Sequence, residues 1–448
     1  MSDVLTSVGI DVGTTSTQLV VSRLRVENRA SGFAVPEMVI TDREILYRSP
    51  VHFTPLVKEK LVDGMKLRCI VEEEYKIAGI SREKVDTGAV IVTGETSRRE
   101  NARTVLEALS ELAGDFVVTT AGPDLESVLA AKGAGAVEFS RDTGKTVLHM
   151  DIGGGTSNLA LIRNGKILQT GCLNVGGRLV KFSDLGAVTY LSTVLSGICS
   201  WKIGEVPTES QKKALAGILA EALEMAAGLR EFSPIMAQLL TEEAEQPWQV
   251  PEEVPVISFS GGVADCIREA IPPLTFGDLG PELGRAIRES RLCSGEYILG
   301  TETIQATVIG AGCHTTQLSG STVYHQNIRF PLKNLPVLKI SKLSELKEKL
   351  SRQEQQTILS LEGIRSPSYR QVRELAEEIL SKMQPPVLLC LERDMAKALG
   401  QALALRLPSD APVLCIDRIR LEEGSFLDIG TPVGSAVPVV VKTLVFSK

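Results

Sequence analysis

The most constraining feature of the sequence is a strand–turn–strand pattern that occurs twice. In the first copy, residues 8–22, Asp11 closes an apolar strand and a Gly-Thr-Thr-Ser turn follows. In the second copy, residues 147–162, Asp151 holds the same place before a Gly-Gly-Gly-Thr-Ser turn. A hairpin repeated at such a long interval predicts two related half-domains that face each other, because solenoid repeats have much shorter periods.

Both turns have the composition of a phosphate-binding loop. Glycine lets a ligand approach the backbone closely, successive backbone N–H groups bind anions, and hydroxyl side chains add donors. Asp11 and Asp151 would converge on Mg²⁺, which prefers one or two carboxylates together with waters and phosphate oxygens. The predicted phosphate-binding residues are Gly13, Thr14, Thr15, Gly153, Gly154, Gly155 and Thr156.

Two other nucleotide-binding loops do not fit the sequence. A Rossmann loop opens a helix, but the residues after Gly155 read as a strand. Residues 142–146 suggest a Walker A loop, yet Phe139 stands where its first glycine is required. A single glycine-rich hairpin is most often only a turn, so the prediction depends on both copies and on the strand that ends at Gly261 and Gly262.

The rest of the chain alternates strands and helices, which predicts layered α/β domains. Its 448 residues correspond to about three domains, and we place these at residues 1–145, 146–320 and 321–448. Asn164-Gly165 predicts a type I′ hairpin turn. Strands are expected at residues 89–93, 116–119, 166–170, 256–260, 387–391 and 413–417. Helices are expected up to about residue 112 and at residues 124–134, 303–312, 341–355, 367–383 and 394–407, with Ser366 and Pro367 starting the helix at 367.

Composition argues against several classes of partner. A net charge of −7, from 48 Lys and Arg against 55 Asp and Glu, leaves no concentrated basic face for nucleic acid. Arg98, Arg99 and Arg103 form a small basic cluster that could meet an acidic partner surface or a phosphate, although the pattern favours a solvated helix face. The uncharged stretch 185–201 is too polar and too short for a membrane span, and no secretory signal is visible. We therefore expect a cytoplasmic protein with neither nucleic acid nor a membrane as its partner.

Cysteine and histidine do not indicate a transition-metal site. The eight cysteines are widely spaced, with no Cys-x-x-Cys pair, and the four histidines are scattered. His149 lies within an apolar strand, so we expect it to be a hydrogen-bonded core residue.

Taken together, these motifs resemble those of the actin, Hsp70 and sugar-kinase ATPase superfamily. Residues 11–17 resemble its first phosphate motif, 151–157 its second, and 260–262 its adenosine motif, while 124–136 and 303–312 resemble its two connecting helices. The order of all five matches. The resemblance implies an α/β, actin-like ATPase fold with two ribonuclease-H-like half-domains around a nucleotide cleft, followed here by a C-terminal α/β extension.

The resemblance also implies cofactors and site residues. ATP and Mg²⁺ would bind in the cleft, with Asp11 and Asp151 at the metal and with Gly261 and Gly262 at the adenosine. Asp124 falls where a water-orienting acid often precedes the first connecting helix. After Gly122-Pro123 it is equally well placed simply to cap that helix, so both interpretations stay open.

A finer resemblance covers essentially the whole chain and is to the reactivating factors of ethanolamine ammonia-lyase. Segments outside the ATPase motifs carry it, namely residues 93–102, 121–126, 173–178, 391–400, 428–432 and 437–444. The family resemblance implies a chaperone-like release factor with weak ATPase activity. It would exchange damaged cobalamin on the lyase for intact adenosylcobalamin and associate with the ethanolamine microcompartment.

Other functions on the same fold remain open from the sequence. A small-molecule kinase, an actin-like assembly protein and an activator of radical dehydratases share the architecture, and fold does not choose among them. None of the four histidines lies in the Asp-x-His-x-x-Gly motif of base-off cobalamin binding, so we expect the lyase to hold the cofactor. The sequence leaves the oligomeric state open.

Overall fold

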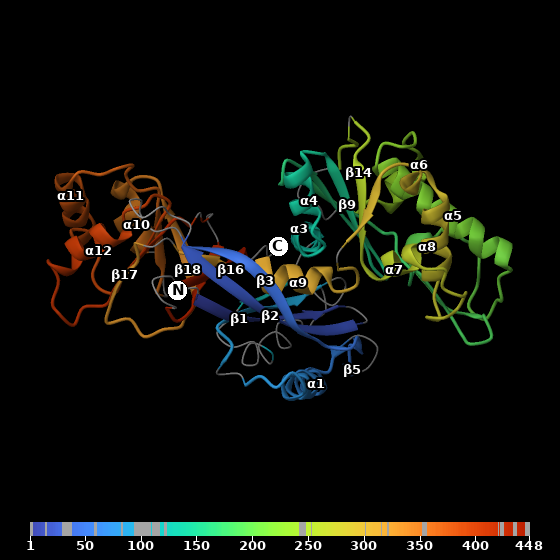
Figure 1. Cartoon of the computed structure of the whole chain (residues 1–448), viewed down its shortest axis with the longest axis horizontal. Coiled ribbons are helices and arrows are strands. Elements are labelled where there is room, and N and C mark those ends of the chain that lie inside the picture. Colours follow the sequence, from blue (N-terminus) through green and yellow to red (C-terminus); the bar gives the residue numbers. More distant parts are fainter. Residues whose placement is uncertain are drawn as a thin grey trace.

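The structure is a computed structural model and describes most of the chain (Figure 1). The described residues are 3–13, 16–28, 38–57, 61–81, 84–93, 109, 117–120, 123–241, 248–251, 253–300, 302–314, 316–319, 322–351, 356–419, 421, 425–432 and 437–443. Several predicted features lie outside these residues: Thr14, Thr15, the arginine cluster and the helix expected to end near residue 112. Of that helix the structure describes Leu109, which is buried.

The N-terminal part of the chain forms a sheet with strand order β3-β2-β1-β7-β8, and the short strand β4 (His52–Phe53) also pairs with β2. The first three strands are antiparallel neighbours, whereas β7 and β8 run parallel to β1. The strands are β1 (Asp3–Val12), β2 (Ser16–Asn28), β3 (Met38–Arg48), β7 (Thr87–Val92) and β8 (Val117–Thr120).

A second sheet repeats this topology, with strand order β11-β10-β9-β14-β15. Its first three strands are again antiparallel neighbours, and β14 and β15 again run parallel to β9. The strands are β9 (Val147–Ile152), β10 (Ser157–Arg163), β11 (Lys166–Leu173), β14 (Val256–Ser260) and β15 (Tyr297–Leu299). The duplication read from the sequence is thus confirmed strand by strand, as is the predicted hairpin turn, because Asn164 and Gly165 both have positive φ.

Two helices cross between the half-domains. Helix α3 (Pro123–Gly133) follows the first sheet and packs on β10 and β11, whereas α9 (Ala306–His314) follows the second sheet and packs on β1, β2 and β7. Their backbones meet closely, since a Cβ on Gly133 would collide with the carbonyl of Ala306 and one on Gly310 with the carbonyl of Leu129. Small residues at the crossing are therefore a steric requirement.

Further elements surround the two sheets. Two-residue strands β5 (Leu56–Val57) and β6 (Leu61–Val62) pair with each other, as do β12 (Val180–Phe182) and β13 (Val188–Leu191). The helices are α1 (Gly64–Ile77), α4 (Ala136–Thr143), α5 (Glu209–Ala226), α6 (Pro234–Leu239), α7 (Gly262–Arg268) and α8 (Gly280–Glu289). The largest apolar core lies between the second sheet and α5, α7 and α8.

The C-terminal region forms a separate sheet of eight strands, with order β16-β23-β22-β18-β19-β20-β21-β17 (left in Figure 1). Helices α10 (Leu346–Ser351), α11 (Tyr369–Leu380) and α12 (Ala396–Ala404) cover one face of its parallel strands. On the other face of these parallel strands, apolar residues of β22 and β23 form a second core with residues of β18, β19, β20 and β21. The strands are β16 (Thr316–Leu318), β17 (Tyr324–Gln326), β18 (Leu332–Ile340), β19 (Ile358–Leu361), β20 (Val387–Leu391), β21 (Val413–Asp417), β22 (Ser425–Ile429) and β23 (Pro438–Thr443).

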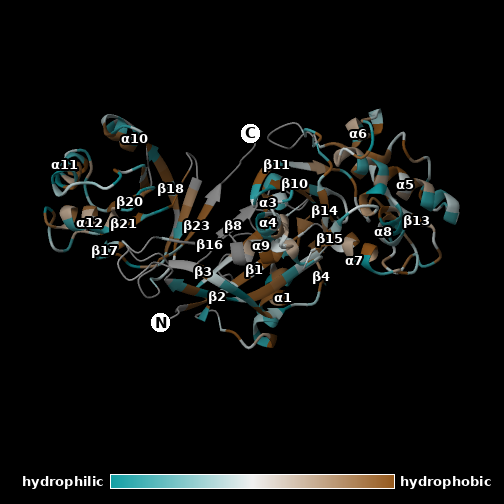
Figure 2. Ribbon diagram, turned by 45° about the horizontal axis from the view of Figure 1, so that its top comes forward, coloured by the Kyte–Doolittle hydropathy of each residue, from teal (hydrophilic) through white to brown (hydrophobic). Residues whose placement is uncertain are grey.

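Hydropathy follows this layering. Figure 2 shows hydrophobic strands such as β1 and β18 inside the molecule and hydrophilic turns on the outer helices α5 and α11.

Strand β23 joins the C-terminal region to the two half-domains, because Val440 packs with Ala89 on β7, Leu129 on α3 and Ala311 on α9. Within the described residues, no helix has the length and apolar character of a membrane span.

Several predicted helix boundaries differ from those of the structure, and for three of these helices the local reason is clear. The helix expected from Pro367 with Ser366 as N-cap begins at Tyr369, because Ser368 and Gln371 form a capping box while Ser366 adopts a φ of 50°. The helix expected from residue 341 begins as a 3₁₀ turn at Leu343–Glu345 and becomes α-helical at Leu346–Ser351, while residues 352–355 lie outside the described residues. The segment expected to continue from Asp124 to Ala136 breaks at Gly135, whose φ of 79° separates α3 from α4.

Candidate functional site

The two repeated aspartates lie near the ends of equivalent strands. Asp11 is the penultimate residue of β1 and Asp151 that of β9. Each turn closes in the same way, because the N–H of Gly13 donates to Ser16 O at 2.8 Å and the N–H of Gly153 donates to Thr156 O at 2.9 Å. These two amides are used by the turns, so a phosphate would have to be met by other donors of the loops.

Asp151 is held by a buried chain of hydrogen bonds. Ser260 at the end of β14 donates from Oγ to Asp151 Oδ1 at 2.5 Å, and His149 Nε2 lies 2.9 Å from Ser260 Oγ. Since the Ser260 proton is used on Asp151, His149 must donate from Nε2, and its Nδ1 accepts from Ser258 Oγ at 2.9 Å. Burial lowers the pKa of His149 to about 3, so the ring is neutral. The expectation of a hydrogen-bonded core histidine is confirmed.

Asp11 has a simpler environment. Thr93, just beyond β7, donates from Oγ1 to Asp11 Oδ1 at 2.9 Å. Burial, opposed by the hydrogen bond from Thr93 and supported by the negative charge of Asp151, raises the pKa of Asp11 to about 7. Burial also raises the pKa of Asp151 to about 6. The charge of Asp151 thus disfavours the charged form of Asp11, an effect that a divalent cation between the two carboxylates would reverse.

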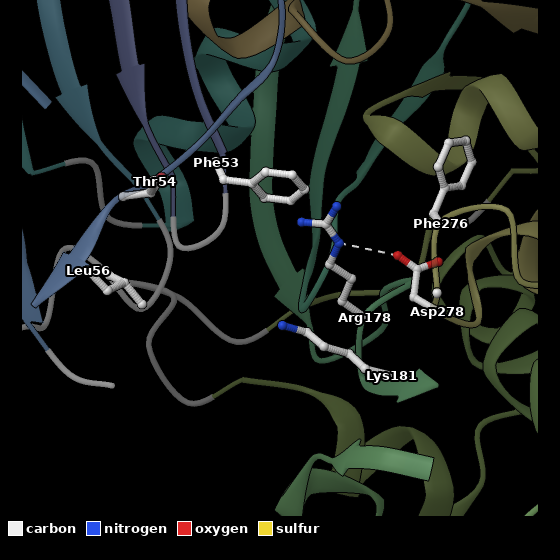
Figure 3. A pocket seen from close by; sticks show the side chains of 8 residues that line it. Phe53, Thr54, Leu56, Arg178, Lys181, Phe276 and Asp278 are labelled. Atoms are coloured by element: carbon white, nitrogen blue, oxygen red, sulfur yellow. Dashed lines mark hydrogen bonds and ion pairs between the residues drawn. The ribbon is translucent and has the colours of Figure 1, made fainter. Parts of the chain in front are cut away.

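A cleft of about 290 Å³ lies between the half-domains beside both turns (Figure 3). Thr54, on the first half-domain, donates from Oγ1 to the carbonyl of Gly13 at 2.8 Å and thus joins the cleft wall to the first turn. Figure 3 shows the Arg178 side chain extending from the second half-domain toward Phe53, while Lys181 extends across the cleft toward the side of Leu56. The lining residues are Phe53, Thr54, Leu56, Arg178, Lys181, Phe276, Gly277 and Asp278.

Arg178 joins the cleft to the second turn. Its N–H donates to the carbonyl of Gly154 at 2.6 Å, and the side-chain carbons lie 3.3–3.4 Å from where a Cβ on Gly154 would stand. Its Nε donates to Asp278 Oδ2 at 3.2 Å, while Asp278 Oδ1 accepts from the N–H of Gly280 at the start of α8. A cation fixed beside a glycine turn suits a phosphate chain.

The predicted adenosine motif lies at the end of β14. Gly261 has a φ of 84°, and a Cβ there would collide with the carbonyl of Ile152, so only glycine fits this approach to the second turn. Gly262 begins α7. The motif therefore contacts the strand that carries Asp151.

Asp124 lies in the first turn of α3. Its Oδ1 accepts a 2.5 Å hydrogen bond from Thr170 Oγ1 on β11, so the side chain is joined to the second half-domain. Since α3 starts after the end of β8, it begins at the same edge of the first sheet as Asp11.

Asp11 and Asp151 offer the kind of ligand that Mg²⁺ prefers, namely carboxylate oxygens. No group of three or more His, Cys, Asp or Glu side chains among the described residues is placed to bind a metal ion. Two carboxylates are enough for Mg²⁺, which keeps several waters. Sequence reasoning missed Thr54 and Lys181 and gave Arg178 no role, because nothing in their local sequence indicates that chain folding brings them to the cleft.

The family model of the ethanolamine utilisation protein EutA matches residues 3–447 of the chain. The chain is 40% identical to the ethanolamine ammonia-lyase reactivase EutA of Salmonella typhimurium, covering 99% of this chain and 98% of that protein. It is 39% identical to the corresponding reactivase of Escherichia coli, with the same coverage. A Ppx/GppA family structure from Aquifex aeolicus covers 68% of this chain and 97% of its own, at 14% identity and a TM-score of 0.44.

Proposed function

Because the chain belongs to the EutA family of ethanolamine utilisation proteins, we propose that it is an ATP-dependent reactivating factor for ethanolamine ammonia-lyase. The observation that carries the proposal is 40% identity to a reactivase over 99% of the chain. In this role the protein releases damaged cobalamin from the lyase so that intact adenosylcobalamin binds. The lyase is therefore its partner.

We assign the nucleotide to the cleft between the repeated hairpins. Asp11 and Asp151 would hold Mg²⁺, and the Gly13 and Gly153–Gly155 turns would hold the phosphate chain. A bound Mg²⁺ supplies neutralising charge to phosphate oxygens. Arg178 and Lys181 add positive charge at the cleft wall. Gly261 and Gly262 would face the adenosine.

Four residues of the chain would then have distinct roles in slow ATP hydrolysis. Ser260 and Thr93 orient the two carboxylates, and Arg178 holds the phosphate chain against the second turn. Asp124 would orient the attacking water from the first turn of α3. Its bond to Thr170 restricts its orientation. The variant Asp124→Asn is expected to slow hydrolysis while ATP binding persists.

Nucleotide state would act on the lyase by changing closure of the half-domains. A ligand shifts such an equilibrium only by its different affinity for the two states. A nucleotide in this cleft would contact both half-domains in the closed state. Loss of its terminal phosphate would remove contacts to each half-domain, and so would change the affinity for the closed state relative to the open one. We also propose association with the ethanolamine microcompartment, in keeping with the family.

The test is recovery of inactivated ethanolamine ammonia-lyase activity with free adenosylcobalamin, Mg²⁺ and ATP. Wild type should restore activity only with ATP, and Asp151→Asn should not restore it. The exposed Asp184→Asn in the same half-domain is the matched control and should behave as wild type. Failure of folded, ATP-binding wild type to restore activity would contradict the proposal and favour a kinase or an assembly ATPase.

A further inference from the structure

An amide side chain lies opposite each of the repeated aspartates. Gln18 on β2 is the cross-strand partner of Asp11, and Asn158 on β10 is the cross-strand partner of Asp151. Directly opposed residues of an antiparallel pair project from the same face of the sheet. Each amide therefore lies beside one aspartate, and both are buried, with 3% of Gln18 and 5% of Asn158 exposed.

The nitrogen atoms of the two amides bind chain that comes from the opposite half-domain. Gln18 Nε2 donates at 3.4 Å to the carbonyl of Ile304, two residues before α9. Asn158 Nδ2 donates at 2.8 Å to Glu126 Oε2 on α3. Since α9 follows the second sheet and α3 follows the first, each amide ties its own hairpin to the other half of the molecule.

The oxygen atoms of the same amides are left without donors. Because each nitrogen points at an oxygen acceptor, the orientation of the amide is fixed. Gln18 Oε1 and Asn158 Oδ1 are buried and have no hydrogen-bond partner among the described residues. A buried acceptor without a donor is unfavourable. In both half-domains, therefore, a buried amide oxygen beside the aspartate has no donor among the described residues. This repeated arrangement indicates a ligand that presents hydrogen-bond donors to the two amide oxygens.

We propose that Gln18 and Asn158 couple the metal–phosphate site to the connecting helices. This rests on the proposed nucleotide site. Each amide oxygen accepts from the water shell of the Mg²⁺ between Asp11 and Asp151, since water bound to a cation directs its hydrogens outward. Each amide nitrogen holds α9 or α3, so binding of the metal nucleotide and the position of the crossing helices depend on one another.

The experiment measures the apparent Mg²⁺ affinity of the full-length protein in the presence of ATP, and ADP binding in EDTA. Gln18→Met and Asn158→Leu remove the amides and keep similar volume. Each should weaken Mg²⁺ binding about 10-fold, the lower end for residues that orient a metal site, with metal-free ADP binding unchanged. Gln238→Met is the control, because Gln238 also donates to backbone carbonyls but does so at Val194 and Ser196, away from the cleft.

A second pair of variants separates the two atoms of each amide. Gln18→Glu and Asn158→Asp keep an oxygen but lose the N–H donor, so Mg²⁺ binding should persist. Hydrogen exchange in α3 and α9 should then no longer slow when MgATP binds. Unchanged Mg²⁺ affinity in the folded Met and Leu variants, or equal losses with and without Mg²⁺, would overturn the coupling role alone. Wild type without Mg²⁺-dependent ATP binding would overturn the nucleotide site as well.

Discussion

The two hairpins share a turn but support their aspartates differently. Asp151 is buried and held by Ser260, His149 and Ser258 in a continuous hydrogen-bonded chain within its own half-domain. Asp11 is only partly buried and receives a hydroxyl from Thr93. In the proposed metal site, Asp151 would be a ligand already fixed by its neighbours, whereas the charge of Asp11 would depend more on what enters the cleft. Duplication preserved the geometry of the turn and let its surroundings diverge.

A change at the helix crossing should affect both hairpins alike and have the largest effect. In Gly310→Ala, the added methyl meets the backbone of Leu129, and we expect a loss of about 3 kcal/mol in the free energy of unfolding, or insoluble protein. The control is Gly217→Ala within α5, where nothing lies within 4 Å of an added Cβ. That variant should gain about 0.5–1 kcal/mol. Urea unfolding measures both, and equal stability of the two variants would contradict the tight crossing.

Changes in the support of each aspartate should affect the hairpins unequally. Ser260→Ala removes the hydroxyl from Asp151 and leaves the buried His149 Nε2 without its acceptor. We expect Mg²⁺ affinity to fall about 10-fold and stability to fall by about 1–3 kcal/mol. Thr93→Val should lower Mg²⁺ affinity only about 3-fold, since water can reach the partly exposed Asp11. Titrations of Mg²⁺ with ATP compare the two, and a larger effect of Thr93→Val would reverse the assignment of the rigid half.

The pH dependence of stability should separate the aspartates more finely. Each has a pKa raised above its unfolded value of 3.8, so the folded protein holds more protons and loses stability as pH rises to about 7 for Asp11 and about 6 for Asp151. Each group contributes a slope of at most about 1.4 kcal/mol per pH unit. In metal-free buffer, Asp11→Asn should flatten the slope from about pH 4 to pH 7, whereas Asp151→Asn should flatten it only up to about pH 6, so the interval between pH 6 and 7 responds to Asp11 alone. Urea unfolding at half-unit steps gives these slopes, and identical windows would contradict the unequal environments.

The sequence predicted those parts of the fold that local pattern determines. Strands β14, β20 and β21 have the predicted bounds because each is a short apolar run between polar or turn residues. The predicted start of α11 was wrong because Ser366 and Ser368 are both suitable N-cap residues. The reciprocal hydrogen bonds of Ser368 with Gln371 decide between them, and the local sequence does not show these bonds.

The candidate site was only partly predictable for the same reason. Asp11, Asp151 and their glycines stand in short motifs that a reader of the sequence can recognise. Thr54 and Arg178 owe their place to contacts across the fold, such as that of Thr54 with Gly13 and that of Arg178 with Asp278. The Gln18 side chain donates a hydrogen bond to the carbonyl of Ile304, and no local sequence pattern indicates which distant residue a side-chain amide will bind.

The most direct test of one metal–nucleotide site shared by two unequal hairpins is calorimetric titration of ATP with and without Mg²⁺. Wild type should bind ATP at least about 100-fold more tightly with Mg²⁺, and Asp11→Asn with Asp151→Asn combined should bind it weakly and equally in both buffers, since two carboxylates hold the ion. Of the single variants, Asp151→Asn should lose more of the Mg²⁺ effect than Asp11→Asn. Retention of the Mg²⁺ effect in the double variant would contradict the account.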